Sequence, residues 1–278
     1  MSAYRFCRTD DVALLVDALN RCWSPHFPDE PAVTPASFKR SIRDLQVWCS
    51  SCMVAFAGAD PIAVLIGAKR SSGTLIHKIA VHPDHLRQGH GRHLLTSLSS
   101  KLAILGPPRM VAEVPETLAP TCALFSACGY VEEARLTDYI LESDETTVKP
   151  AGMLIPVTID DLAANGLLEN DQQASWERSV ETLTARKDEI EGFAVASDER
   201  IEAFILYLND GEILSLRSFI EDDGTRLAQL LSHLGARGMR SFRFAKVHPA
   251  EIARELLATL GFRPAGGHLL YTARARSA

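Results

Sequence analysis

Residues 79–95 read IAVHPDHLRQGHGRHLL, and this stretch decides the fold of the first half of the chain. Apolar residues lead into a His-Pro turn, a Gly-x-Gly pair follows at positions 89 and 91, and paired leucines come after it. This order predicts a strand that ends at Val81 and an amphipathic helix that begins at Gly91. The first N–H groups of a helix have no partner within it and lie at the positive end of its dipole. The turn before the helix is therefore a candidate anion site.

The residues of this turn favour a phosphate ligand. Its two glycines have no Cβ atoms, so the backbone can approach a phosphate closely, and Arg87 and Arg92 add positive charge. A pyrophosphate is a natural ligand for such a turn. There are two alternatives: a helix that merely begins with glycines, and a Rossmann dinucleotide turn. The Rossmann pattern fits poorly, because its third glycine would fall at Leu94 and several strands precede the motif.

The composition is that of a globular protein with a substantial core. The chain has 278 residues, of which 46% are hydrophobic and 23% charged, and its mean hydropathy is +0.01. This apolar content excludes intrinsic disorder, and the length allows one large domain or two small ones. The longest apolar runs, such as residues 61–68, are far shorter than the ~20 residues that span a membrane.

Charge and cysteine usage limit the partners and the compartment. The net charge is −6, so the chain lacks the basic field that non-specific nucleic-acid binding requires. Residues 1–5 contain no apolar signal segment, and we expect a cytoplasmic protein with free thiols and no membrane partner. The six cysteines all lie in the first half. Cys49-x-x-Cys52 stands alone, without the second pair that a structural zinc site needs.

Helical and strand patterns alternate along the first half. Apolar residues at helical spacing from Val12 to Cys22 predict the first helix, and the proline-rich residues 24–35 predict a loop. Further helices are expected at residues 38–45, 91–105 and 119–128, and strands at residues 5–7, 53–57, 62–68, 74–81, 109–114 and 139–141.

The second half repeats this order after a polar linker at residues 143–152. Helices are expected at residues 175–184, 226–234 and 249–260, and strands at residues 193–196, 203–208, 212–219, 241–247 and 269–272. Residues 124–130, LFSACGY, and 256–262, LLATLGF, both combine a helix end, a glycine and an aromatic residue. We therefore predict an internal duplication, with domains at residues 1–145 and 146–278.

The stretch from Val81 to Leu95 resembles motif A of the GNAT superfamily of acyl-CoA N-acyltransferases. That motif combines a Val-x-Pro strand end, Arg/Gln-x-x-Gly-x-Gly/Ala and a helix with paired leucines. The order of strands and helices in residues 1–142 is also similar to the GNAT fold. The resemblance implies an α/β fold of two tandem GNAT-like domains, each a central mixed, mostly antiparallel sheet flanked by helices.

The resemblance also implies that acetyl-CoA is the co-substrate and that no metal is needed. The backbone of the strand end, at Ile79, Ala80 and Val81, would pair with the pantetheine arm. The loop and helix amides would hold the pyrophosphate; they belong to Arg87, Gln88, Gly89, His90, Gly91 and Arg92. Leu86 stands where the family usually has Arg or Gln, but the amides do not need that side chain.

Four histidines cluster in this loop and in the first helical turn: His82, His85, His90 and His93. Two of them flank the candidate phosphate site, and their spacing does not favour zinc. We expect solvated loop residues and ring stacking on the cofactor.

Direct attack of an amine on the thioester requires a general base. His77 is the first candidate, because alternation along the strand puts it on the same face as Ile79 and Val81. Some GNAT members have a working histidine at the corresponding strand position. Glu113 on the neighbouring strand is the second candidate, and Tyr130, acting through water, is a third. The alternative for His77 is a purely structural strand histidine.

Two positions differ from the family pattern for proton transfer. Many members have a tyrosine acid where this chain has Phe125, and a frequent asparagine falls near Leu118. A phenyl ring cannot protonate a departing thiolate. The resemblance implies an N-acetyltransferase that acts on an amine, and the alternative is a non-catalytic acyl-CoA-binding or sensing protein.

The loop after the first helix is the candidate acceptor site. In the GNAT family this region borders the acceptor pocket, which implies roles for Trp23, Phe27, Asp29 and Glu30. The two acids would attract a cationic amine, and the aromatic rings would pack on it. The alternative is a proline-rich connector anchored by a buried tryptophan. The acceptor, a small molecule or a peptide, and the oligomeric state stay open.

The second half lacks the phosphate turn. Residues 220–226, IEDDGTR, place three consecutive acids at the corresponding position. Coulomb repulsion disfavours an anion there. We therefore predict a degenerate GNAT-like copy that binds no cofactor.

Overall fold

The computed structural model describes residues 2–142, 152–168 and 174–277, and the chain forms two compact units. Unit 1 comprises Met1–Glu133 with Leu269–Ala278, and unit 2 comprises Ala134–His268. The domains expected from sequence have other bounds, because two long strands, β6 (Val131–Glu142) and β12 (Arg263–Arg274), each contain residues of both units. The expected linker at residues 143–152 lies almost wholly outside the described residues.

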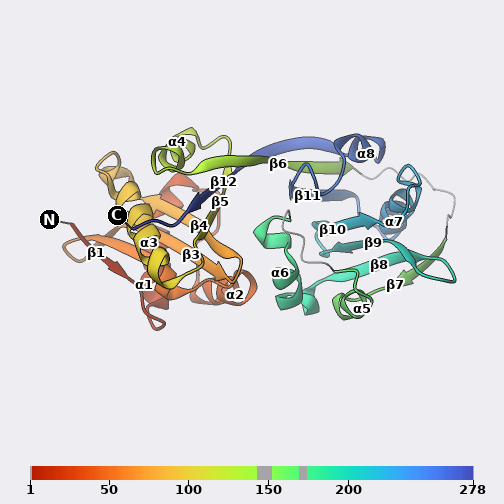
Figure 1. Cartoon of the computed structure of the whole chain (residues 1–278), viewed down its shortest axis with the longest axis horizontal. Coiled ribbons are helices and arrows are strands. Elements are labelled where there is room, and N and C mark those ends of the chain that lie inside the picture. Colours follow the sequence, from red (N-terminus) through yellow and green to blue (C-terminus); the bar gives the residue numbers. More distant parts are fainter. Residues whose placement is uncertain (1, 143–151, 169–173, 278) are drawn as a thin grey trace. The chain divides into compact units, whose positions relative to one another are not determined.

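Unit 1 follows the predicted order of helices and strands (Figure 1). Its elements are β1 (Ser2–Phe6), α1 (Val12–Cys22), η1 (Ser24–His26), α2 (Pro35–Leu45), η2 (Cys49–Ser51), β2 (Met53–Ala57), β3 (Asp60–Arg70), β4 (Gly73–Val81), η3 (Pro83–His85), α3 (His90–Leu105), β5 (Arg109–Pro115) and α4 (Ala119–Ala127). Helix α2 begins earlier than predicted, because Thr34 and Ser37 form a capping box around Pro35 in the first turn.

The sheet of unit 1 is mixed and mostly antiparallel, as predicted. Its strand order is β1-β2-β3-β4-β5, with β12 next to β5. The pairs from β1 to β4 are antiparallel, and β4 with β5 is parallel. Helices cover this sheet: Ala63 and Leu65 of β3 share an apolar cluster with α3, and α1 also packs against β3. The alternate β3 residues Val64 and Ile66 are equally buried, so the strand is covered on both faces.

Helix α3 supplies much of the core of unit 1. Leu94, Leu95, Leu98 and Leu102 recur at helical spacing, and each is at most 3% exposed. They pack in one cluster with inward-facing residues of β2 to β5. The paired-leucine pattern that predicted this helix is therefore its buried face, and this face fixes the start of α3 next to the end of β4.

Unit 2 repeats the element order of unit 1, so the predicted duplication is confirmed in the fold. Its elements are β7 (Met153–Pro156), α5 (Ile159–Ala164), η4 (Trp176–Arg178), α6 (Val180–Ala185), η5 (Lys187–Glu189), β8 (Glu191–Ala196), β9 (Ile201–Tyr207), β10 (Ile213–Ser218), α7 (Thr225–Ala236), β11 (Ser241–Val247) and α8 (Arg254–Thr259). The helix expected at residues 175–184 was wrong in part. It is divided into η4 and α6, because Ser179 caps α6 and ends the turn before it.

The last strand of the chain completes unit 1. Tyr271 of β12 is 4% exposed, and its ring stacks on that of Phe125 with 5.7 Å between centroids. Beyond the strand, the Ala275 N–H donates to the carbonyl of Pro108 at 2.6 Å. The strand expected at residues 269–272 is thus the middle of a longer one. Side-chain packing and backbone hydrogen bonds fix its end to the core of unit 1.

Replacing Tyr271 tests this assignment. We expect Tyr271→Ala to lower the free energy of unfolding of unit 1 by about 3 kcal/mol, because it removes a buried aromatic ring. Urea unfolding would be followed by fluorescence in a Trp176→Phe background, where Trp23 and Trp48 both report on unit 1. Arg274→Ala changes an exposed side chain of the same strand and should stay within about 0.5 kcal/mol. An unchanged unfolding curve for Tyr271→Ala would contradict the assignment.

Candidate functional site

Strands β4 and β5 separate soon after they begin. Among the described residues, their parallel pairing is recorded only at Thr74 with Met110 and at Leu75 with Val111. In the described part of the chain no pair of β4 with β5 follows Leu75. The two strands therefore form a split, open towards the loop that leads to α3.

The open edge of β4 presents backbone hydrogen-bonding groups. The His82 N–H donates to the carbonyl of Ile62 at 2.8 Å, and hydrogen-bonded positions alternate along an antiparallel pair. The N–H and C=O groups of Ile79 and Val81 therefore point away from β3 and into the split. A ligand arm with amide groups can pair with such an edge as an added strand would.

A β-bulge interrupts β4 at His77. The register passes from Ile66 opposite Lys78 to Gly67 opposite Ile76, which leaves His77 as the extra residue. Bulges break the two-residue alternation and re-aim side chains. The alternation that put His77 on the face of Ile79 therefore does not hold across the bulge, and the candidacy of His77 as a base now rests on the family resemblance alone.

The loop between β4 and α3 turns a row of backbone N–H groups outward. Arg87 and Gly89 have left-handed φ values of 63° and 86°. Within the described ranges, no backbone hydrogen bond is recorded from the N–H groups of residues 87–92, and helical bonding begins when His93 donates to Gly89. Consecutive N–H groups exposed in this way at a helix N-terminus form an anion nest.

The nest fits the pyrophosphate of acyl-CoA. A Cβ atom built on Gly89 would meet no heavy atom within 4 Å, so the space beside this glycine is open. The side chains of Arg87 and Arg92 are exposed on either side of it, and Gln88 is exposed as well. Leu86 is 47% exposed and leaves the N–H row uncovered.

Gly91 lies in a packed position. A Cβ atom at this position would lie 2.9 Å from Cδ2 of Leu124 on α4. The missing side chain therefore lets α3 and α4 approach each other. The two glycines of the Gly-x-Gly motif thus have different surroundings, open at Gly89 and packed at Gly91.

His90 is buried, which corrects the expectation of four solvated histidines. It is 5% exposed, and its Nδ1 lies 2.6 Å from the hydroxyl of Tyr4, a residue that sequence reasoning missed. Burial lowers the pKa of His90, and His85 and His93 lower it further. The ring of His93 lies 3.8 Å from that of Tyr4. These contacts hold the side chain of His90 against Tyr4 in the first turn of α3. Only the backbone N–H of His90 can therefore contribute to the nest.

The two candidate bases lie on the two diverging strands. His77 is half-buried in the bulge of β4, and Glu113 is half-buried on β5. Ala112 and Val114, the neighbours of Glu113, pack into the core under α3, so Glu113 faces the opposite side of the sheet. Both candidates have polar neighbours. Tyr130 is 6% exposed, and its hydroxyl contacts the sulfur of Met110, which does not favour a role in proton relay.

The acceptor loop is anchored to β4 by contacts that the sequence did not indicate. The rings of Trp23 and Phe27 stack at 4.3 Å between centroids. Lys78 places its ammonium 3.9 Å from the Trp23 ring centroid and 3.5 Å from the Glu30 carboxylate. Glu30 also accepts the indole N–H of Trp23 at 2.9 Å. The charge of Glu30 is thus already balanced, whereas Asp29 is exposed.

Phe125 belongs to the core of unit 1. It is 1% exposed and packs edge-to-face on Tyr130 at 4.9 Å, in addition to its stack on Tyr271. A hydroxyl introduced here would need a buried partner. The position of the usual family acid is therefore filled by an apolar side chain with a packing role.

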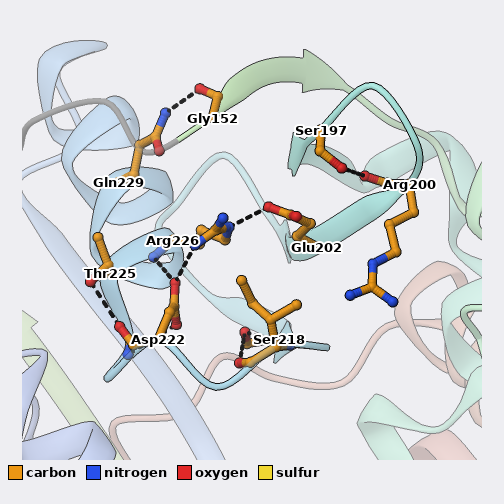
Figure 2. Close-up of polar contacts among 11 residues, drawn as sticks. Gly152, Ser197, Arg200, Glu202, Ser218, Asp222, Thr225, Arg226 and Gln229 are labelled. Atoms are coloured by element: carbon orange, nitrogen blue, oxygen red, sulfur yellow. Dashed lines mark hydrogen bonds and ion pairs between the residues drawn. The ribbon is translucent and has the colours of Figure 1, made fainter.

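In unit 2 the nest that corresponds to residues 87–92 is filled by an acid of the chain itself (Figure 2). The carboxylate of Asp222 accepts the N–H groups of Gly224 at 3.2 Å and Arg226 at 2.9 Å. The guanidinium of Arg226 bonds the same carboxylate at 3.0 Å and also bonds Glu202. One fixed carboxylate occupies the N–H groups that would otherwise face a phosphate.

The split of unit 2 is filled as well. Glu212, the residue before β10, forms an isolated parallel bridge with Arg243 of β11. The guanidinium of Arg178 then donates to the carbonyl of Leu214 on β10 at 3.4 Å and to that of Lys246 on β11 at 3.0 Å. A Glu251 carboxylate balances it through two hydrogen bonds of 2.6 Å each.

The part of the chain that the structure describes, residues 2–142, 152–168 and 174–277, holds no group of three or more His, Cys, Asp or Glu that could bind a metal ion. It also holds no helix with the length and apolar character to cross a bilayer. The cysteines are free thiols, and burial raises the pKa of Cys7 and Cys22 to about 12.

A split parallel pair beside a helix N-terminus characterises the fold of unit 1. Residues 12–130 match the model of the acetyltransferase (GNAT) family. No curated protein sequence is significantly similar to the chain.

Solved structures extend the fold match to the whole chain. The tandem GNAT protein from the clavulanic acid biosynthesis pathway is 19% identical, with 100% of both chains covered and a TM-score of 0.67. A putative acetyltransferase from Pyrococcus horikoshii is 17% identical over 99% of this chain and 90% of that one, with a TM-score of 0.66. A GCN5-related N-acetyltransferase from Sphaerobacter thermophilus is 14% identical over 99% and 96%, with a TM-score of 0.65. The chain therefore has the tandem GNAT fold.

The packing role of Gly91 can be tested with a double mutant. We expect Gly91→Val to lower the free energy of unfolding of unit 1 by about 1–3 kcal/mol, because its side chain overlaps Leu124. In a Leu124→Ala background the same change should cost clearly less, since the overlap is removed. Urea unfolding measures both. Equal costs in the two backgrounds would show that Leu124 is not what limits this position.

Proposed function

We propose that the chain is an N-acetyltransferase that moves the acetyl group of acetyl-CoA to an amine, with unit 1 as the catalytic unit. The observation that carries this proposal is the row of outward N–H groups at residues 87–92 beside the open edge of β4. A pyrophosphate complements the N–H row, and an arm with amide groups complements the strand edge. Acyl-CoA combines both groups in one molecule.

The proposed reaction is direct attack. The amine nitrogen bonds to the thioester carbonyl carbon, the carbon–sulfur bond breaks, and the sulfur leaves as a thiolate or thiol. A base must take one proton from the nitrogen. We assign that role to His77, since imidazole accepts protons near neutral pH and His77 is a half-buried residue of β4, the strand with the open edge. Glu113 is the alternative base.

The acceptor is proposed to be a cationic amine, on a small molecule or a peptide. Trp23 and Phe27 offer a stacked aromatic surface, and Asp29 offers an exposed negative charge. Glu30 contributes less than the sequence suggested, because Lys78 already balances it. The charge attraction therefore rests mainly on Asp29.

A second candidate function is acyl-CoA binding without turnover. The apolar core packing of Phe125 favours it, because no acid stands at the position that usually protonates the leaving sulfur. Thiol release in the presence of a panel of amines separates the two functions. Binding of acetyl-CoA without release for any amine would favour the second.

One chain should bind one acetyl-CoA. Unit 1 has an open nest, whereas in unit 2 Asp222 and Arg178 fill the corresponding places. Titration calorimetry should give a stoichiometry near one, and two equivalent sites would contradict the proposal.

Gly89→Ala should weaken acetyl-CoA binding at least tenfold, because a side chain strains this left-handed residue and intrudes on the nest. Gly58→Ala, at φ 63° with equally open surroundings, is the matched control and should leave affinity unchanged.

The role of His77 can be tested by kinetics. We expect His77→Ala to lower kcat/KM by about 10²-fold or more, the usual scale for loss of a general base, with little change in acetyl-CoA affinity. The loss should depend on pH, because the base must be unprotonated to act. His248→Ala removes a histidine of unit 2 and serves as control. Full activity of His77→Ala at every pH would assign it a structural role and make Glu113 the next residue to replace.

A further inference from the structure

The side chain of His26 occupies one backbone group at the open edge of β4. Its Nε2 lies 2.8 Å from the carbonyl oxygen of Val81. A carbonyl only accepts hydrogen bonds, so Nε2 carries the proton and donates it. The alternation of the β3–β4 ladder points this carbonyl into the split. His26 therefore reaches from η1 to the same edge that would receive an amide-containing arm.

A second anchor holds the same loop to the same strand. Lys78 lies over the Trp23 ring and pairs with Glu30, four residues beyond His26. The two anchor points on β4, Lys78 and Val81, flank Ile79 and Ala80. The loop with the candidate acceptor residues is thus attached to β4 just before and at the end of the segment at residues 79–81, which the proposed function assigns to the pantetheine arm.

We propose that His26 is a positioning residue that holds the Val81 carbonyl until the pantetheine arm of acyl-CoA replaces it, and so couples the acceptor loop to cofactor binding. The inference rests on the proposed function, because it uses the same strand edge. In this proposal an arm amide and the His26 imidazole compete for the Val81 carbonyl oxygen. Binding of acyl-CoA then releases one anchor of the loop at residues 23–30 and leaves the Lys78 anchor in place.

The expected change in acetyl-CoA affinity follows from the strength of the hydrogen bond between His26 and Val81. A net hydrogen bond of ordinary strength corresponds to about a two- to tenfold change in an equilibrium constant. Removing the His26 imidazole should therefore tighten acetyl-CoA binding by about two- to tenfold. By linkage, anything that holds the loop in its anchored position should weaken acetyl-CoA binding by the corresponding factor.

Calorimetry with two ligands tests the competition. His26→Ala should bind acetyl-CoA two- to tenfold more tightly than wild type, and it should bind adenosine 3′,5′-bisphosphate, which lacks the pantetheine arm, with unchanged affinity. His26 is exposed, so its replacement leaves the core intact. Unchanged or weaker acetyl-CoA binding would overturn the inference, and so would equal tightening for both ligands. If the wild type binds no acetyl-CoA, the proposed function fails instead.

Fluorescence tests the coupling to the loop. In a Trp48→Phe, Trp176→Phe background, Trp23 is the one remaining tryptophan. Acetyl-CoA should change its emission, and adding His26→Ala should shift the ligand-free emission towards the bound value and reduce the change. His248→Ala is the control and should alter neither. The same full change on binding with and without His26 would show that the loop is not coupled to the cofactor through this hydrogen bond.

Discussion

The site depends on one constraint: two parallel strands that pair only where they begin. β4 and β5 pair at Thr74 and Leu75 and then diverge, so the backbone groups of Ile79 and Val81 that point away from β3 meet no strand among the described residues. Backbone polar groups need partners, and leaving them unmet inside a protein is costly. An open strand edge at the surface can instead take water or a ligand arm. The leucine face of α3 maintains this arrangement, because it packs the helix under the strands and fixes the nest beside the edge.

In unit 2, side chains of the chain itself bond the corresponding backbone groups. Arg178 bonds carbonyls of both diverging strands, and Asp222 accepts the N–H groups at the start of α7. The Arg178–Glu251 pair is almost fully buried, with side-chain exposures of 2% and 5%. Burying two charges costs about as much as their attraction returns, so the pair is poor evidence for stability. Its clearer consequence is that it fills the split, which explains how one fold yields an open site in one copy and a closed one in the other.

The sequence predicted what local patterns encode. Helix α3 and the order of elements followed from leucine spacing and turn residues, and the structure agrees. The contacts of Tyr4 with His90, Lys78 with Glu30 and Tyr271 with Phe125 could not be predicted, because they join residues 48 to 146 positions apart. No local signal marks such pairs. The bulge at His77 was missed for a related reason: a one-residue register shift leaves the hydrophobic pattern of β4 almost unchanged.

Phe125 packs in the core where the family usually has an acid, so the proposed reaction depends on which of its two proton transfers is harder: protonation of the leaving sulfur or deprotonation of the amine. A thiol with a pKa near 8.5 leaves tolerably well as an anion, so the sulfur does not strictly require an acid beside it. An amine at neutral pH is mostly protonated, and without losing a proton its nitrogen cannot attack. The demanding proton transfer is therefore the first one, at the nitrogen. A chain that gives the acid position to the core and keeps His77 and Glu113 on the two strands of the split retains two candidate bases for that step, and Phe125 removes only the easier of the two proton transfers.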